Sequence, residues 1–158
     1  MLNCDTILGL DLASMIGFHR DHGGLATFAL RDSGGTNAYS RIEIDASGRI
    51  RRMRLLRGRA RGEFDDYPAE MAPEMAAALK PYMYCGAMVC EPAVLEMLPK
   101  APPFSLMGGL FAPIAAQGLP LCGYVDRSFF RTVDDLGSYE ALRAEFAASP
   151  PPLAYMPR

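Results

Sequence analysis

The chain has 158 residues, of which 50% are hydrophobic and 22% are charged, and its formal net charge is -2. This composition is typical of one globular domain and excludes a disordered chain, and the small net charge gives no general attraction to nucleic acid or anionic lipid. The sequence has no apolar run of about 18 residues and no signal peptide at its start. We therefore expect a cytoplasmic protein that binds neither nucleic acid nor membrane.

The first residues predict a strand with one carboxylate at its end. Met1–Asp5 has the pattern of a buried strand of the parallel type, and Asp5 would lie at its carboxyl end, where open α/β sheets bind ligands and metals. Such a strand needs neighbours on both sides. The chain therefore has the pattern of the back part of a larger fold, and we expect self-association or a partner that carries the N-terminal half.

A helix follows, capped by Asp11 and ended by Gly23, with an apolar stripe. The stripe consists of Leu12, Met15, Ile16 and His19. His19 and His22 lie three residues apart, which permits metal binding from one helix face. Their place at the C-terminal end of the helix favours an interaction with the helix dipole, or solvation, over a metal site.

The middle of the chain predicts a strand, a hairpin and a surface excursion. These segments are the strand Leu25–Leu30, the flexible turn Asp32–Asn37, the hairpin Arg41–Asp45 with Arg49–Leu55, and the excursion Gly58–Pro81 with a short helix at Met71–Leu79. The hairpin alternates apolar and charged residues, so one of its faces is expected to be solvated.

Seven arginines between Arg49 and Arg61 are the strongest charge anomaly of the chain. They are Arg49, Arg51, Arg52, Arg54, Arg57, Arg59 and Arg61. Alternate members share a strand face, which permits a patch for phosphate or nucleic acid. The acids that follow at once, Glu63, Asp65 and Asp66, favour mutual neutralisation on a solvated sheet edge instead.

The second half returns to an α/β pattern, with Tyr82–Cys90 as a central strand. Gly86 interrupts this strand, either as a bulge or as a place where a ligand approaches the backbone, and we favour the approach of a substrate. The further elements are short helices at Pro92–Leu98 and Leu106–Gln117 (capped by Ser105), strands at Leu119–Val125 and Phe129–Val133, and a helix at Ser138–Ala147 with Tyr139, Leu142 and Phe146 inward. The pattern therefore predicts one domain over residues 1–148, followed by a proline-rich tail over residues 149–158.

The four cysteines, Cys4, Cys85, Cys90 and Cys122, form no C-x-x-C pair and lie in apolar segments. Buried reduced thiols are commoner than disulfides in such segments, and zinc binding by these residues alone is not expected.

The order of several short motifs resembles one family. The motifs are Asn3-Cys4-Asp5-Thr6, His19-Arg20, Ala26-Thr27, Ile44 to Ile50, Tyr84-Cys85-Gly86 with Pro92, Gly118 to Tyr124, and Phe130 to Tyr139. This succession resembles the C-terminal portion of the sugar-1-phosphate nucleotidylyltransferases, or NDP-sugar pyrophosphorylases. The resemblance implies a Rossmannoid, GT-A-like α/β fold, incomplete at the N-terminus, with a mixed sheet and flanking helices. It also implies the synthesis of a nucleotide sugar and pyrophosphate from a nucleoside triphosphate and a sugar 1-phosphate.

The resemblance also assigns site residues. Asp5 occupies the place of the aspartate of the family's N-G-D motif, which holds the catalytic Mg²⁺, so Asp5 is the expected catalytic and metal-binding residue. Ser40, Gly86 and Thr132 occupy substrate-binding places. Thr132 stands where the family has its second metal carboxylate, and Asp134 or Asp135 would replace that carboxylate if the loop shifts by two or three residues.

The family's glycine-rich loop, G-G-x-G-T-R-L, has no counterpart in this chain. Two functions therefore stay open. The chain is the rear section of a nucleotidyltransferase that acts only as part of a longer protein, or it is a noncatalytic nucleotidyltransferase-like domain that binds or regulates a partner. Under either reading the isolated chain is expected to be inactive.

Overall fold

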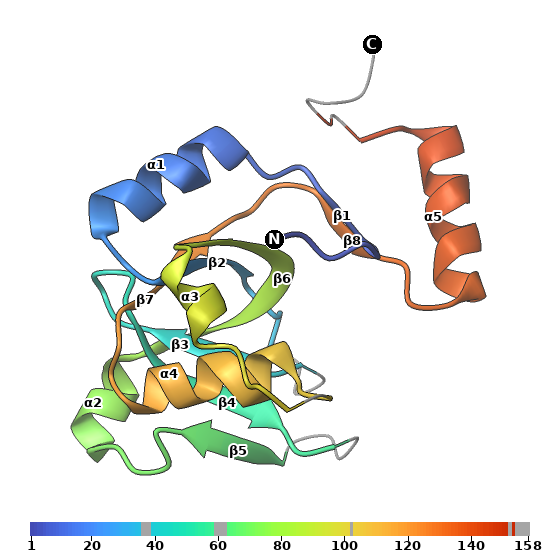
Figure 1. The fold of residues 1–158 in the computed structure, drawn as a ribbon. Helices are drawn as coiled ribbons and strands as arrows, with labels where there is room; N and C mark the ends of the chain where they lie inside the picture. Colours follow the sequence, from blue (N-terminus) through green and yellow to red (C-terminus); the bar gives the residue numbers. More distant parts are fainter. Residues whose placement is uncertain (36–38, 59–62, 102, 152, 154–158) are drawn as a thin grey trace.

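A six-stranded mixed sheet forms the centre of the molecule (Figure 1). The computed structural model describes residues 1–35, 39–58, 63–101, 103–151 and 153. The strands lie in the order β5 (Phe64–Tyr67), β4 (Ile50–Leu56), β3 (Arg41–Ile44), β6 (Lys80–Cys90), β2 (Ala26–Arg31) and β7 (Leu121–Val125). β2 and β7 are parallel, and the other neighbours are antiparallel. The prediction of a mixed sheet with flanking helices is confirmed.

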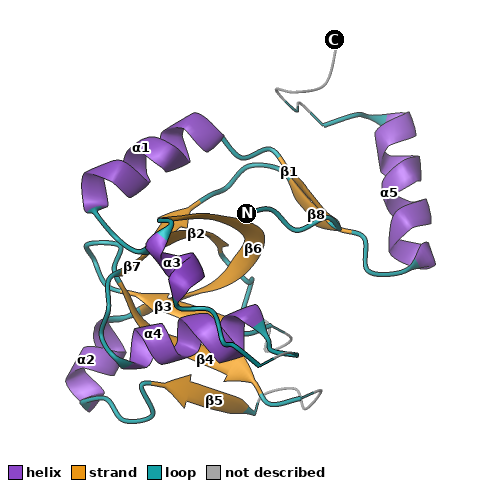
Figure 2. Ribbon diagram, in the orientation of Figure 1, coloured by secondary structure: helices purple, strands orange, loops and turns teal. Residues whose placement is uncertain are grey.

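Helices cover both faces of this sheet (Figure 2). The helical segments are α1 (Leu12–His22), α2 (Pro73–Ala78), α3 (Ala93–Glu96), η1 (Leu106–Phe111), α4 (Ala112–Ala116) and α5 (Leu136–Ala148). Phe28 of β2 packs edge to face on Phe111 at 4.8 Å, whereas the next residue, Ala29, packs on Met15 of α1. Because successive strand residues point to opposite faces, α1 and the η1–α4 segment lie on opposite faces.

The helix boundaries follow local signals in the sequence. The Asp11 carboxylate accepts a hydrogen bond from the Ser14 N–H, and Gly23 ends α1 with a φ of 55°. Ser105 caps η1, which continues directly into α4, and this confirms the helix predicted over Leu106–Gln117. In α5, Leu142 is buried but Tyr139 is 50% exposed, so the inward position predicted for Tyr139 is wrong. α5 lies apart from the six-stranded sheet, beside the ribbon of β1 (Thr6–Leu8) and β8 (Phe130–Thr132) (Figure 1), and Phe146 of α5 packs edge to face on Phe129 with ring centroids 5.9 Å apart.

The strand predicted over Met1–Asp5 is wrong. The strand at this end of the chain is β1 (Thr6–Leu8), which pairs antiparallel with β8 (Phe130–Thr132) in a separate two-stranded ribbon. Residues 1–5 are exposed, and only Leu2 forms a bridge, to Ala87 of β6. A buried strand needs neighbours on both sides, whereas this segment contacts β6 on one side only.

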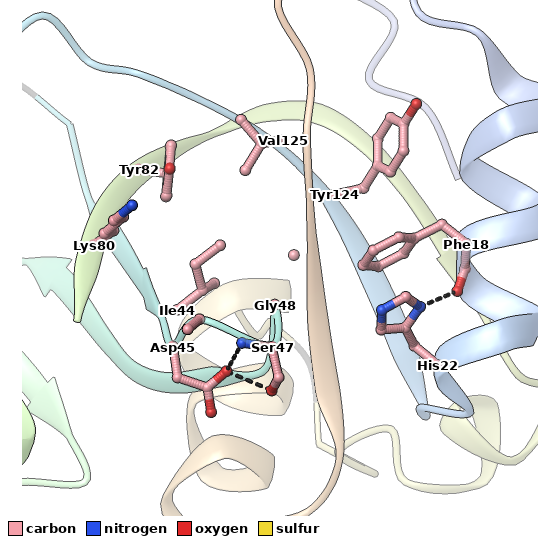
Figure 3. A pocket seen from close by; sticks show the side chains of 12 residues that line it. Phe18, His22, Ile44, Asp45, Ser47, Gly48, Lys80, Tyr82, Tyr124 and Val125 are labelled. Carbon is pink, nitrogen blue, oxygen red and sulfur yellow. Dashed lines mark hydrogen bonds between the residues drawn. The ribbon is translucent and has the colours of Figure 1, made fainter. Parts of the chain in front are cut away.

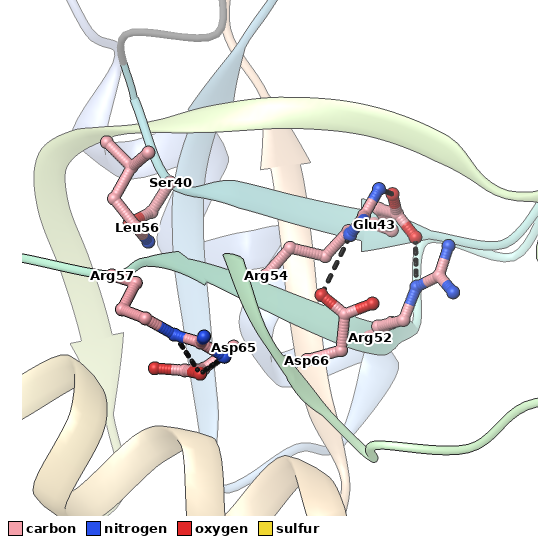
Figure 4. Close-up of polar contacts among 8 residues, drawn as sticks. All are labelled: Ser40, Glu43, Arg52, Arg54, Leu56, Arg57, Asp65 and Asp66. Carbon is pink, nitrogen blue, oxygen red and sulfur yellow. Dashed lines mark hydrogen bonds and ion pairs between the residues drawn. The ribbon is translucent and has the colours of Figure 1, made fainter. Parts of the chain in front are cut away.

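The surface excursion predicted over Gly58–Pro81 is also wrong in part, because Phe64–Tyr67 forms the edge strand β5. This strand covers β4, so the arginines of β4 do not form the sheet edge. The predicted neutralisation by the acids that follow is confirmed for two arginines (Figure 4): Arg54 pairs with Asp66 at 2.9 Å, and Arg57 pairs with Asp65 at 2.6 Å. Arg59 and Arg61 lie outside the described residues.

Two further acids that the sequence did not indicate neutralise Arg51 and Arg52. Glu43 of β3 is 5% exposed and accepts a hydrogen bond from Arg52 Nε at 2.6 Å, and Asp45 pairs with Arg51 at 2.6 Å. Glu43 faces Arg52 directly across the β3–β4 pair. A cross-strand partner of this kind becomes visible only when the register is known.

The cysteines differ in exposure. Cys85 and Cys122 are buried, Cys90 is half-buried and Cys4 is exposed, and all four are free thiols. Burial raises the pKa of Cys85 to about 12. The predicted burial is therefore wrong for Cys4, because this residue lies in the turn that precedes β1.

The structure also bears on the predicted proline-rich tail and on the expectation that the chain does not cross a membrane. In the tail predicted over 149–158, residues 149–151 and 153 are described without regular structure, and Leu153 is buried. Within the described residues, none of the helices has the length and apolar character that a membrane crossing requires.

Asp45 fixes the turn between β3 and β4. Its carboxylate accepts hydrogen bonds from the Ser47 N–H at 2.9 Å, the Ser47 hydroxyl at 2.6 Å and Arg51 Nε at 2.6 Å. Partial burial raises the pKa of Asp45, but the bonds from Ser47 and Arg51 outweigh burial and lower the pKa from 3.8 to about 2.

We expect Asp45 to stabilise the fold in a pH-dependent way. Because its pKa is lower in the folded than in the unfolded chain, the contribution is full above about pH 4 and is lost as the pH falls toward about 2. The shift corresponds to about 2 kcal/mol. In urea denaturation, Asp45→Asn should lower the free energy of unfolding by that order at neutral pH and have little effect near pH 2. The matched substitution Asp21→Asn, at an exposed helix residue, should change neither value. An equal loss at both pH values would contradict the prediction.

Candidate functional site

The ribbon of β1 and β8 brings together two of the residues that the sequence assigned to the site. Thr6 faces Thr132 across the ribbon, and the Val133 N–H donates to the Asp5 carbonyl at 2.8 Å. Asp5 and Thr132 are far apart in the sequence, so this proximity is a product of the fold. The role of Asp5 and Thr132 in a shared metal site stays a prediction.

Hydroxyl groups orient two carboxylates at this place. The Thr6 hydroxyl donates to Asp5 Oδ1 at 3.2 Å, and the Thr132 hydroxyl donates to Asp134 Oδ2 at 2.9 Å. Asp135, the other candidate replacement, accepts from the Ser138 N–H at 2.7 Å as the N-cap of α5. This hydrogen bond and the neighbouring Ser138 hydroxyl lower the pKa of Asp135. Asp135 is therefore engaged at the start of α5, whereas Asp134 is bonded to the Thr132 hydroxyl.

Gly86 lies beside this group, under the N-terminal segment. Its carbonyl accepts a hydrogen bond from the Asn3 N–H at 2.7 Å, and its φ is +83°. A Cβ at this position would lie 2.9 Å from the Thr6 hydroxyl and 3.2 Å from Asn3 Cβ. The β2–β6 register also shifts here, between Phe28 and Leu30. The missing side chain thus admits the segment that carries Asp5, and a role of Gly86 toward a substrate stays a prediction.

Ser40 has a different setting. It precedes β3, and its hydroxyl oxygen accepts a hydrogen bond from the Leu56 N–H at 3.0 Å, which ties the start of β3 to the end of β4 (Figure 4). The structure therefore groups Asp5, Gly86 and Thr132 but gives Ser40 a contact within the hairpin. The substrate-binding role of Ser40 stays a prediction.

The donor set at Asp5 consists of hard oxygen atoms. Asp5, Asp134, Thr6 and Thr132 supply two carboxylates and two hydroxyls, which suits Mg²⁺ rather than a soft metal. Within the described residues, no three His, Cys, Asp or Glu side chains are grouped as a complete metal site. Mg²⁺ commonly takes one or two protein carboxylates, with water and substrate phosphates as its other ligands, so these residues fit a cation that binds together with a phosphate substrate.

The two histidines have separate roles. His19 is 4% exposed, with Nδ1 2.8 Å from the Thr27 hydroxyl and Nε2 3.1 Å from Glu91 Oε1. The predicted solvated or dipole position is therefore wrong for His19, because it lies one helical turn from buried Met15. His22 donates from Nδ1 to the Phe18 carbonyl at 2.9 Å, in agreement with the predicted contact at the helix end. The Met15–His19 spacing in the apolar stripe was the signal that indicated burial.

Comparison with known proteins shows a distant relation. Over 132 residues the chain is 26% identical to a UTP–glucose-1-phosphate uridylyltransferase of Synechocystis sp. (strain PCC 6803), a match that covers 82% of this chain and 29% of that protein. The chain thus spans less than a third of the length of the curated relative. No protein-family model matches it. These findings support a distant relation to nucleotidyltransferases.

Proposed function

We propose that this chain forms the sugar-phosphate side of a GT-A-like nucleotidyltransferase that transfers a nucleotide from a nucleoside triphosphate to a sugar 1-phosphate. The observation that carries the proposal is the pairing of β1 with β8, which puts the Asp5 backbone next to Thr132 and Val133, in a chain similar to a uridylyltransferase. Asp134 is bonded to the Thr132 hydroxyl at the same place. Asp5 and Thr132 lie 127 positions apart in the sequence. Their adjacency is what a shared metal would require.

The residues at this place have defined tasks in the proposed reaction. A bound Mg²⁺ would screen the charge between two phosphate groups and polarise the one under attack. Asp5 would hold the cation, and the Thr6 hydroxyl would fix the orientation of the Asp5 carboxylate. Asp134 would supply the second carboxylate in place of Thr132, whose hydroxyl orients it. The glycine-rich loop that binds the triphosphate in the family would have to be supplied in addition to these residues.

The proposal is tested by metal-dependent binding of a nucleotide sugar. UDP-glucose should bind to the chain more tightly with Mg²⁺ than with EDTA in isothermal titration calorimetry, and Asp5→Asn should abolish the difference. Asp21→Asn serves as the matched control, because it removes a charge on α1 outside the ribbon. If the affinity for UDP-glucose changed neither on removal of Mg²⁺ nor on Asp5→Asn, the proposed metal-binding role of Asp5 would be excluded.

We expect the 158-residue chain by itself to release no pyrophosphate from UTP and glucose 1-phosphate, because its sequence has no counterpart of the family's glycine-rich loop, whose backbone N–H groups bind the triphosphate. Pyrophosphate release would be followed with a coupled enzyme assay, with the Asp5→Asn protein as the background. Release well above that background would contradict the expectation.

A second function, a noncatalytic domain that binds or regulates a partner, has one observation in its favour. Thr132 holds a neutral hydroxyl where the family has a carboxylate, and a hydroxyl shares the charge of a cation less well. Under this reading, UDP-glucose binding either does not depend on Mg²⁺ at all or depends on it equally in the wild-type and Asp134→Asn proteins. Under the catalytic reading, the same substitution weakens this dependence.

A further inference from the structure

A cavity of about 420 Å³ lies away from the ribbon, among the β3–β4 turn, β6, β7 and the end of α1 (Figure 3). It exists because the sheet curls: the Gly123 N–H of β7 donates to the Gly48 carbonyl of the turn at 2.9 Å, and Arg49 forms a bridge with Cys122. The cavity is the space enclosed between the β3–β4 turn and β7 on one side and β6 on the other. Its volume falls in the range of small-molecule sites, about 300 to 1,000 Å³.

One wall of the cavity is aromatic. The Phe18 and His22 rings stack with centroids 3.7 Å apart, and Tyr124 meets Phe18 edge to face at 5.4 Å. A Cβ at Gly48 would lie 3.3 Å from Phe18 Cζ, so the turn holds this ring in place. Tyr82 lies on the other side of the cavity (Figure 3). Fixed aromatic faces of this kind favour flat or ring-shaped ligands.

Two polar groups at the cavity have atoms left for a ligand. His22 Nδ1 contacts the Phe18 carbonyl, which can only accept, so Nδ1 carries the proton and Nε2 of the neutral ring is an acceptor. Nε2 faces the cavity (Figure 3), and the described part of the chain offers it no hydrogen-bond partner. Lys80 lies beside Tyr82, and within the described residues no carboxylate is within ion-pair distance of its ammonium group.

The acid of this cavity does not neutralise Lys80. Asp45 Oδ1 accepts from Ser47 and from the Arg49 N–H at 3.1 Å, and Oδ2 accepts from Arg51. Its negative charge is therefore directed at the turn and at Arg51. The cavity presents a cation on one side, aromatic rings on the other, and an imidazole acceptor.

We propose that this cavity binds a phosphorylated ring compound, that is, a nucleoside or sugar phosphate. The ring packs against the aromatic wall that Phe18, His22 and Tyr124 form, a hydroxyl or ring N–H donates to His22 Nε2, and the phosphate pairs with Lys80. The two polar contacts use atoms that the described residues leave without a partner, and the apolar contact uses aromatic side chains that line the cavity.

The cavity is separate from the Asp5 site. Asp5 precedes the N-terminal end of α1, whereas Phe18 and His22 lie at its C-terminal end, and the 11 residues of α1 span about 16 Å. Binding in the cavity needs no metal, and the proposal therefore does not depend on nucleotidyl transfer.

The histidines give a direct test. The chain has two of them, His22 at the cavity and His19 buried elsewhere, so their ring protons report the site and an internal reference. Protein with ¹³C-labelled histidine would be titrated in EDTA with UMP, glucose 1-phosphate, uridine and inorganic phosphate. UMP or glucose 1-phosphate should shift the His22 signals and leave those of His19 in place. A stronger response to UMP identifies a base as the ring, and an equal or stronger response to glucose 1-phosphate identifies a sugar.

The lysines provide a matched pair of variants, because Lys80 and Lys100 are the two lysines of the chain and both are exposed. Lys80→Gln should weaken the binding about tenfold, as expected when one charge-assisted contact is lost, and Lys100→Gln should leave it unchanged. Lys80→Arg, which keeps the charge, should restore most of the affinity.

Four results would overturn the proposal. They are the absence of a His22 shift with both phosphorylated compounds, equal binding of inorganic phosphate, equal binding of uridine, and equal effects of Lys80→Gln and Lys100→Gln. Asp5→Asn should leave the His22 titration unchanged. If UDP-glucose showed no Mg²⁺-dependent binding, the cavity proposal would still be tested by the His22 titration. If the His22 titration failed, the proposed role of Asp5 would still be tested by the Mg²⁺ dependence.

Discussion

Replacing Asp5 by asparagine should weaken the binding of Mn²⁺, used as a paramagnetic substitute for Mg²⁺, at least about tenfold. The loss follows from the donor set. Asp5 is one of two carboxylates at the β1–β8 ribbon, and an amide supplies a neutral oxygen in place of a charged one. The measurement is the broadening of amide signals by Mn²⁺, with UDP-glucose present to supply phosphate ligands.

The neighbouring aspartates provide the controls. Asp134→Asn should weaken Mn²⁺ binding as Asp5→Asn does, whereas Asp135→Asn should have little effect, because Asp135 caps α5 and asparagine caps a helix about as well. All three substitutions keep the shape of the side chain. If Asp135→Asn weakened the binding as much as Asp5→Asn, the assignment of Asp134 would be wrong.

Replacing Gly86 by alanine should lower the free energy of unfolding by about 3 kcal/mol, from two causes. A φ of +83° is unfavourable for a residue with a Cβ, and that Cβ would lie 2.9 Å from the Thr6 hydroxyl. The chain must shift the segment from Asn3 to Thr6 to relieve the contact. Urea denaturation gives the stability, and hydrogen exchange of the Asn3 amide reports whether the segment has moved from β6.

Gly118 separates the two causes. Its φ is +70°, and a Cβ at this position would meet nothing within 4 Å, so Gly118→Ala carries the backbone cost alone, about 1 kcal/mol. The difference between the two variants measures how tightly the N-terminal segment packs on β6. Equal losses would mean that this packing contributes nothing at Gly86.

The histidines and arginines show where local patterns succeeded and failed. The neutralisation of the arginines by Asp65 and Asp66 was predictable because these acids follow directly in the sequence. The Glu43–Arg52 pair depended on cross-strand register, and the His19–Glu91 contact joins α1 to the residue that follows β6. Contacts between residues this far apart in the sequence cannot be predicted from a local pattern.

The sequence by itself determined the elements whose signals are local. Asp11, Gly23 and Ser105 bound helices through hydrogen bonds to nearby backbone groups, and the alternation over 41–55 gave the hairpin. The likeness of the motifs also indicated Asp5 and Thr132 as members of one site. These inferences needed only the chemistry of neighbouring residues and the order of motifs.

The tertiary structure decided which distant residues meet. It exposed Met1–Asp5, paired β1 with β8, and bonded Asp134 to the Thr132 hydroxyl while Asp135 became the cap of α5. It also formed the cavity between Phe18 and Lys80, which lie in different parts of the chain. Strand pairing and sheet curvature arise from burial summed over the whole core, so a short stretch of sequence does not contain them.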